Sequence, residues 1–156
     1  MTTLNRILQM PQKPTWWRYK KIFLHDSNIS IYRALEYEAL SNVPFSGRIL
    51  DFGGGMRSHY LPALKSWMRE GVYESVNISA EMEPTYLIAP GDELPLGTGT
   101  FDMILSMNTL EHVYDVEGAL RELIRVLKPG GRVVLAVPFL FRVHGSPDDY
   151  NRPTAS

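Results

Sequence analysis

An acidic residue followed by three glycines is the part of this sequence best suited to chemistry. The run Asp51-Phe52-Gly53-Gly54-Gly55 follows a short apolar stretch. Such a pattern is typical of a buried strand that ends in a tight turn of an α/β sheet, where ligands bind beyond the carboxyl ends of the strands. Glycine allows positive φ and a close approach of backbone to a ligand, because it has no Cβ atom. We therefore predict a ligand site at Asp51 and the glycine turn, residues 53–55.

Two classes of ligand fit a turn of this kind, and a purely structural turn is the third interpretation. A dinucleotide places its pyrophosphate at the start of the following helix, and Gly53, Gly55 and Ser58 nearly match the dinucleotide fingerprint. S-adenosylmethionine carries an ammonium and a sulfonium group and no phosphate. The carboxylate of Asp51 would repel a pyrophosphate and attract these two cations, so the sequence favours S-adenosylmethionine.

Two histidines, His112 and His144, are candidates for proton transfer. Each follows a predicted strand at its carboxyl end, on the same side as the glycine turn. Imidazole is the usual side-chain base near neutral pH, and a base is needed if the group acted upon is a hydroxyl or an ammonium. Either histidine could instead serve in packing or in polar bonds within its loop. No set of His and Asp residues has the spacing of a metal site, so we predict none.

The elements that would position these residues alternate between strand and helix. Apolar runs predict strands at residues 48–52, 74–78, 86–89, 101–106 and 132–137. Helical spacing predicts helices at residues 31–40, 61–68 and 115–128, with Lys128 in the last turn. This alternation predicts a parallel sheet wrapped by helices. The link between the strands at 74–78 and 86–89 is short for a parallel crossover, so either its helix is missing or the third strand is displaced.

Composition limits the classes of function. The chain of 156 residues is 44% apolar and 21% charged, which is ordinary for a globular protein. A net charge of -1 gives no sign of a nucleic-acid or membrane surface. The absence of cysteine excludes disulfides, thiolate metal sites and a cysteine nucleophile. We find neither an apolar run of about 18 residues nor a signal peptide, and so expect no membrane span and a cytoplasmic location.

An aromatic and basic segment precedes the predicted domain. Residues 16–23 combine two tryptophans with Arg18, Lys20 and Lys21. The simpler interpretation is a short helix whose aromatic rings pack on the domain while the basic groups stay in water. The alternative is a lid over the ligand site, or a contact for an anionic or lipid-linked substrate.

Three blocks of the sequence resemble a class I S-adenosylmethionine-dependent methyltransferase of the type 11 group. The blocks are residues 49–55, residues 94–104, and residues 110–131, which begin with Leu110-Glu111-His112-Val113 and end with Lys128-Pro129-Gly130-Gly131. The tail at residues 144–154 resembles a subgroup of these enzymes. Together the blocks and the tail extend the resemblance over residues 48–154.

The resemblance implies a fold and a domain division. We expect a Rossmann-like parallel sheet with helices on both faces and strand order 3-2-1-4-5. The family closes this sheet with an antiparallel sixth and seventh strand, and because the sequence stops at Ser156 we expect that pair to be missing. The open edge could then associate with another chain. Residues 1–47 would form an N-terminal helical cap segment, and residues 48–156 the S-adenosylmethionine-binding domain.

The resemblance also implies roles for individual residues. The acid and glycines would hold the methionine end of the cofactor, with its ammonium on backbone carbonyls of the turn. Asn77 aligns with the family acid that holds the ribose hydroxyls, but an amide cannot give the charge-assisted pair of a carboxylate, and Glu81 is a possible substitute. The expected cofactor-binding residues are Asp51, Gly53, Gly54, Gly55, Asn77 and Asn108.

Three functions follow as hypotheses. The first is an enzyme that transfers a methyl group from S-adenosylmethionine to a small-molecule acceptor, with His144 and His112 as catalytic residues. The second is a methyltransferase-like module that binds the cofactor or a partner without catalysis. The third is a NAD-dependent oxidoreductase, which fits the three blocks least well. For the enzyme we expect a cavity for adenosine beside the glycine turn.

Overall fold

The computed structural model describes residues 16, 20, 30–138 and 148–151, and the chain divides into two compact units, Met1–Val43 and Pro44–Ser156. The first unit contains helix α2 (Ile31–Ser41). Ser30 caps its start by accepting a hydrogen bond from the Arg33 backbone N–H at 3.2 Å. This confirms the helix expected at residues 31–40. Most of the aromatic and basic segment at residues 16–23 lies outside the described residues.

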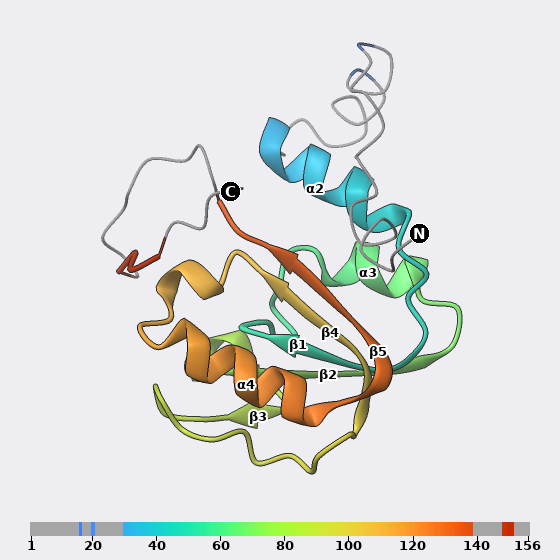
Figure 1. Cartoon of the computed structure of the whole chain (residues 1–156). Coiled ribbons are helices and arrows are strands. Elements are labelled where there is room, and N and C mark those ends of the chain that lie inside the picture. The colour runs from blue at the N-terminus through green and yellow to red at the C-terminus, as the bar shows by residue number, and fades with distance from the viewer. Residues whose placement is uncertain (1–15, 17–19, 21–29, 139–147, 152–156) are drawn as a thin grey trace, which may run out of the picture. The chain divides into compact units, whose positions relative to one another are not determined.

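The second unit is built on a sheet of five parallel strands in the order β3-β2-β1-β4-β5 (Figure 1). This confirms the expected order 3-2-1-4-5. β1 lies between β2 and β4 and pairs with both, so Asp51 at its carboxyl end is at the centre of the sheet. The strands are β1 (Gly47–Phe52), β2 (Gly71–Asn77), β3 (Tyr86–Leu87), β4 (Phe101–Met107) and β5 (Leu127–Ala136).

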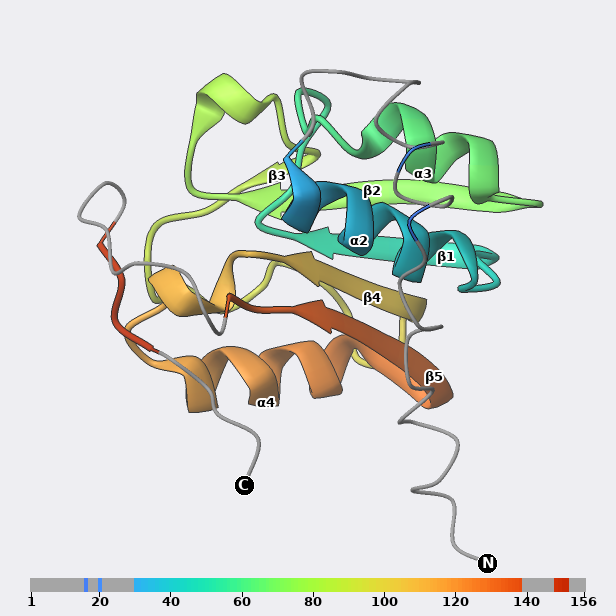
Figure 2. The ribbon, with the colours of Figure 1, turned by 90° about the horizontal axis from the view of Figure 1, so that it is seen from above.

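The described α-helices of the second unit lie on both faces of this sheet. Helix α3 (Leu61–Trp67) and helix α4 (Val116–Val126) lie on opposite sides of the strands (Figure 2). Asp115 caps α4 by accepting from the Gly118 N–H at 2.9 Å. The core between α4 and the sheet consists of buried apolar side chains, which are those of Leu50, Val76, Leu94, Phe101, Ile104, Leu123 and Val126. Both helices expected beside the sheet are therefore present.

The end of α4 differs from the prediction. Lys128 was expected in the last helical turn, but the helix ends at Val126 and Lys128 belongs to β5. Leu127 pairs with Phe101, and pairing resumes only at Arg132 after an irregularity. Pro129 has no N–H to donate within this stretch, which agrees with a break in regular pairing there. The Lys128 ammonium instead lies 2.8 Å from Asp102 Oδ1.

The short link between β2 and β3 contains no α-helix. Its only helical element is a 3₁₀ turn, η2 (Ala80–Met82). β3 nevertheless keeps its place beside β2, with Val76 opposite Tyr86 and Asn77 opposite Leu87. Of the two alternatives left by the sequence, the missing helix is therefore correct. Parallel strands are normally joined by a dozen or more residues, whereas here residues 78–85 make the connection.

Candidate functional site

A buried carboxylate lies directly beneath the glycine turn. Asp51 is fully buried, and two tyrosine hydroxyls donate to the same oxygen, Oδ2. Tyr60, which precedes α3, and Tyr73, from β2, are each 2.7 Å from it. The other oxygen, Oδ1, is also buried and has no hydrogen-bond partner in the structure. Burial raises the pKa of Asp51 to about 6, although the two tyrosine hydrogen bonds oppose this rise.

The glycine turn packs against the protein itself. A Cβ atom added to Gly54 would lie 1.9 Å from Asp51 Oδ2, so the turn sits on the carboxylate. At Gly53, which has φ +88°, an added Cβ would meet Thr109 at 2.2 Å, and at Gly55 it would meet the Met82 carbonyl oxygen at 2.1 Å. The sequence predicts glycines that leave space for a ligand. The structure shows that all three positions also need glycine for contacts within the chain.

Asn77 fastens the turn to the end of β2. Its amide group donates to the carbonyl oxygens of Gly53 and Gly54 at 2.7 and 3.2 Å. Its Oδ1 accepts from the Ser79 N–H at 3.0 Å. The side chain is therefore directed at the turn carbonyls, which are the atoms expected to receive the cofactor ammonium. These hydrogen bonds join Asn77 to the turn, and its expected contact with the ribose stays a prediction.

The link between β2 and β3 is hydrogen-bonded to the residues that follow the glycine turn. The Met56 N–H donates to the Glu83 carbonyl oxygen and the Arg57 N–H to the Met82 carbonyl oxygen, both at 3.3 Å. The Arg57 guanidinium donates twice to Glu83 Oε1, at 2.9 and 2.5 Å. Glu83 adopts φ +50°, a left-handed conformation that is uncommon for a residue other than glycine. Glu81, the alternative to Asn77 for the contact with the ribose, is an exposed residue of this link.

A third group of residues gathers at the carboxyl end of β4. Asn108 follows this strand with φ +51° and donates its N–H to the Ala136 carbonyl oxygen at 2.8 Å. The turn η3 (Leu110–His112) comes next. The His112 Nδ1 lies 2.9 Å from the Asp148 carbonyl oxygen, and the His112 Nε2 lies 3.7 Å from Glu111 Oε1. A carbonyl oxygen only accepts hydrogen bonds, so Nδ1 carries the proton and Nε2 of the neutral ring holds the lone pair.

The segment at residues 148–151 is bound to this turn through its backbone. Both the Tyr150 and Asn151 N–H groups donate to the Glu111 carbonyl oxygen, at 2.7 and 3.2 Å. The Asn151 amide donates to the Val113 carbonyl oxygen at 2.6 Å. The chain after β5 therefore returns to the carboxyl ends of the strands, beside His112. His144 itself lies outside the described residues.

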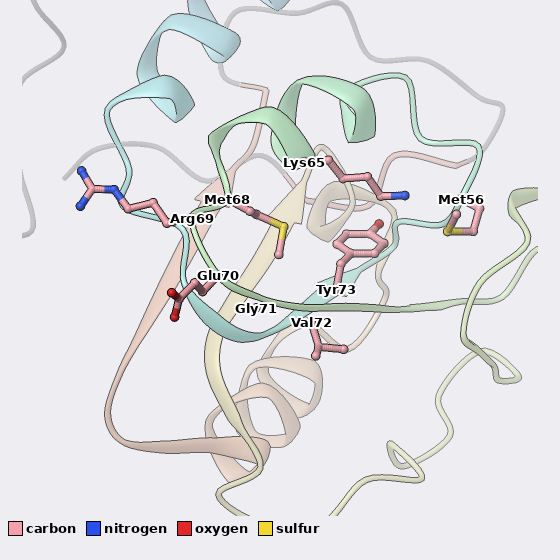
Figure 3. Close-up of a pocket in the computed structure, with 8 residues that line it drawn as sticks. All are labelled: Met56, Lys65, Met68, Arg69, Glu70, Gly71, Val72 and Tyr73. Atoms are coloured by element: carbon pink, nitrogen blue, oxygen red, sulfur yellow. The ribbon is translucent and has the colours of Figure 1, made fainter.

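Two adjoining grooves follow helix α3. The larger, of about 590 Å³, runs between α3 and the start of β2 (Figure 3). In this view Lys65 extends from α3 over the ring of Tyr73 toward Met56, and Met68 lies beside the ring on the side away from Met56. The smaller groove, of about 470 Å³, continues past His59 at the start of α3. Both are on the flank of α3, whereas the Met82 carbonyl oxygen of η2 lies next to Gly55 of the glycine turn.

Comparison with known proteins gives the family. The model of a methyltransferase domain, type 11, matches residues 50–135. The chain belongs to the type 11 methyltransferase family. The match includes Asp51, the glycine turn and His112, and the methyl donor of this family is S-adenosylmethionine. The fold and the motifs described above thus agree with the resemblance seen in the sequence.

Individual relatives cover only part of this chain. A demethylmenaquinone methyltransferase of Streptomyces griseus is 35% identical over 98 residues, which are 56% of this chain and 41% of that protein. Norajmaline N-methyltransferase of Rauvolfia serpentina is 48% identical over 42 residues, 27% of this chain and 14% of that protein. The chain spans less than half the length of these curated relatives.

A solved structure supports the fold. The methyltransferase bound to the Trm112 methyltransferase activator of Haloferax volcanii is 27% identical to this chain, with a TM-score of 0.53. The match covers 62% of this chain and 48% of that one.

Within the part of the chain that the structure describes, no helix has the length and apolar character needed to cross a bilayer. The same residues contain no group of three or more side chains arranged to hold a metal ion.

The residues present fit one end of S-adenosylmethionine better than the other. The buried Asp51 oxygen without a partner suits the positively charged methionine end. At the ribose end, Asn77 is engaged with the turn. Sequence reasoning missed Tyr60 and Tyr73, because hydroxyls of ordinary core tyrosines carry no motif. Only the parallel register, which pairs Asp51 with Ser75 and so puts Tyr73 on the same face of the sheet, could have indicated one of them.

Proposed function

We propose that this protein uses S-adenosylmethionine to methylate a small-molecule acceptor. The observation that carries the proposal is the buried Asp51 carboxylate under the glycine turn, with one oxygen lacking a partner, in a chain of this family. The donor supplies a methyl group activated by its sulfonium. Asp51 would attract the cationic methionine end, and the glycine turn would contact it through backbone atoms. Asn108, at the end of β4, would line the opposite side of the donor site.

His112 is the described residue best placed to act as a base. In the neutral ring its Nε2 holds the lone pair, because Nδ1 donates to the Asp148 carbonyl oxygen. Removal of a proton is needed only if the acceptor is a hydroxyl or an ammonium. His144 remains the second expected catalytic residue. The acceptor class does not transfer from relatives, because the matched enzymes are named for substrates as different as demethylmenaquinone and norajmaline.

A second candidate function is a binding module without turnover. The contacts between η2 and the glycine turn favour it, because Met82 occupies the space next to Gly55. Under the enzymatic proposal the link between β2 and β3 must open for adenosine, and the exposed Glu81 could then reach the ribose. A NAD-dependent reaction is disfavoured, because the Asp51 carboxylate would repel a pyrophosphate at the turn. We also propose that another chain can associate with the edge at β5, which pairs only with β4 in the described sheet.

Titration calorimetry with S-adenosylmethionine and with NAD tests the donor. We expect heat with S-adenosylmethionine alone, and loss of that heat in Asp51→Ala. Asp102→Ala is the matched control. The Asp102 carboxylate belongs to the neighbouring strand β4 and accepts hydrogen bonds from the Arg48 backbone N–H and the Lys128 ammonium. Asp102 lies near the start of β1 in the sheet, whereas the glycine turn follows the end of that strand. Heat with NAD alone, or equal binding by Asp51→Ala, would contradict the proposal. Donor binding without transfer of labelled methyl to any acceptor pool would favour the binding module.

A further inference from the structure

We propose that Tyr60 and Tyr73 are positioning residues for the methyl donor: they fix one oxygen of Asp51 so that the other faces the donor site as its only available carboxylate oxygen. The inference rests on the proposed function, because it concerns how Asp51 meets a cationic ligand. Neither tyrosine belongs to the motif that carries the family resemblance. Their role follows from contacts within this chain alone.

The two tyrosine hydrogen bonds satisfy only one of the two oxygens of Asp51. A carboxylate has two oxygens and about four acceptor positions. Both hydroxyls nevertheless converge on Oδ2 at 2.7 Å, while Oδ1 is buried and has no partner. An unsatisfied buried acceptor is costly, and each such group in a native structure calls for an explanation. The asymmetry therefore indicates that Oδ1 is reserved for a donor that the chain does not provide.

The tyrosines also maintain the charge of the carboxylate. Burial favours the protonated acid, and the hydrogen bonds from Tyr73 and Tyr60 favour the ionised form, so the pKa of Asp51 rises only to about 6. Without these bonds the carboxyl would hold its proton to a higher pH, and a neutral acid would attract a cation poorly. The two hydroxyls thus orient Asp51 and keep it negative near neutral pH.

The groups around Asp51 come from three elements. Tyr60 is the residue before α3, Tyr73 belongs to β2, and Gly54 belongs to the glycine turn. The nearest basic residues along β1 and the turn are engaged elsewhere: Arg48 pairs with Glu74 and Arg57 pairs with Glu83. No arginine or lysine among the described residues contributes to the shift of Asp51. The tyrosines are therefore the groups that offset its burial.

The test compares Tyr60→Phe and Tyr73→Phe with a matched control, Tyr86→Phe. The Tyr86 hydroxyl also donates to a carboxylate of the sheet, that of Glu74, at 2.5 Å, but away from Asp51. The first measurement needs no ligand: the carboxyl carbon of Asp51 is titrated by NMR in protein labelled at aspartate, with Asp51→Asn to assign the signal. We expect the midpoint to rise by about one pH unit in each of the first two variants and to stay unchanged in the control.

The second measurement is calorimetry with S-adenosylmethionine between pH 5.5 and 8.5, in buffers of different ionisation heat. We expect the parent to release protons on binding near pH 6. Each of the two variants should bind roughly five-fold more weakly than the parent at pH 6, because a rise of about one unit in the pKa lowers the ionised fraction from about one half to about one eleventh. The difference should shrink toward pH 8.5, where Asp51 is ionised in all variants. Purely structural damage would weaken binding equally at every pH.

The two proposals fail in different ways. If the parent binds no S-adenosylmethionine at any pH, the proposed function fails, and the role of the tyrosines in donor binding fails with it. If the parent binds the donor, but the Asp51 midpoint and the pH profile of affinity are unchanged in both tyrosine variants, only the present inference is overturned. Circular dichroism of each variant verifies that it is folded before either result is interpreted.

Discussion

Replacing Asp51 by asparagine should remove a charge that the fold tolerates at a cost. The side chain is fully buried, and its Oδ1 has no hydrogen-bond partner. Asparagine keeps the size of the side chain and retains an oxygen that can accept from Tyr60 and Tyr73. It does not titrate. Comparing the stability of the variant and the parent as a function of pH therefore isolates the free energy of ionising Asp51 within the folded protein.

The magnitude follows from the shift in pKa. The pKa of Asp51 rises from 3.8 to about 6 in the fold, which at 1.36 kcal/mol per unit corresponds to about 3 kcal/mol. Because the folded-state pKa is the higher one, the folded parent binds more protons than the unfolded chain between pH 4 and pH 6. The stability that this proton provides is fully present below pH 3.8 and is lost as the pH rises through 6.

The measured quantity is the difference in the free energy of unfolding between Asp51→Asn and the parent, compared at two pH values. Between pH 4 and pH 8, the free energy of unfolding of Asp51→Asn should rise relative to that of the parent by about 2.4 kcal/mol, because at pH 4 a part of the roughly 3 kcal/mol is already lost. The amide adds an N–H group without a partner, whose cost of about 1–3 kcal/mol is the same at every pH. That constant cost therefore cancels when the two pH values are compared.

Urea unfolding at several pH values measures this quantity. Trp67 stacks on Phe45 with ring centroids 6.4 Å apart, so its fluorescence reports on the sheet domain. Trp16→Phe and Trp17→Phe in both proteins leave Trp67 as the only tryptophan. If the stability curves of parent and variant run parallel from pH 4 to pH 8, Asp51 does not ionise within the fold as the structure implies. The reasoning about its charge would then be refuted.

Two further substitutions test the turn itself. Asn77→Asp introduces the acid usual in the family and should lower stability by about 1–3 kcal/mol at pH 7. The reason is that a carboxylate would face the carbonyl oxygens of Gly53 and Gly54, which now lie 2.7 and 3.2 Å from the amide. Equal stability of variant and parent in urea would argue against this contact. Gly54→Ala should cost about 1–3 kcal/mol, because its Cβ would lie 1.9 Å from Asp51 Oδ2, whereas Gly97→Ala, with its nearest atom at 3.3 Å, should change stability little. Similar thermal melting of these two alanine variants would contradict the packing described for the turn.

The fold could be predicted from the sequence because its strands and helices are marked by local signals. The apolar run before Asp51, the capping position of Asp115 and the apolar face of α4 each specify an element independently of the others. The end of α4 could not be placed from local signals, because Lys128 suits a helix terminus as well as the start of β5. Its assignment depends on pairing with β4 and on Asp102, which are both distant in the sequence.

The site could be located from the sequence, but its contacts could not. Asp51 and the glycine turn were recognised from their order along the chain. The direction of the Asn77 amide depends on where the turn carbonyls lie, and the convergence of Tyr60 and Tyr73 on one oxygen depends on how α3 packs over β1 and β2. Such information arises from tertiary packing, and no local spacing carries it.

Because β3 has only two residues, the edge of the sheet at β3 should separate from its neighbour more easily than the central strand β1. β1 is held between β2 and β4, so its amide hydrogens can exchange with solvent only when most of the sheet separates. β3 is held by two paired positions and by the Ile88 N–H on the Asn77 carbonyl oxygen. That edge can detach while the centre stays intact, and deuterium should therefore enter the β3 edge long before it reaches the strand that carries Asp51.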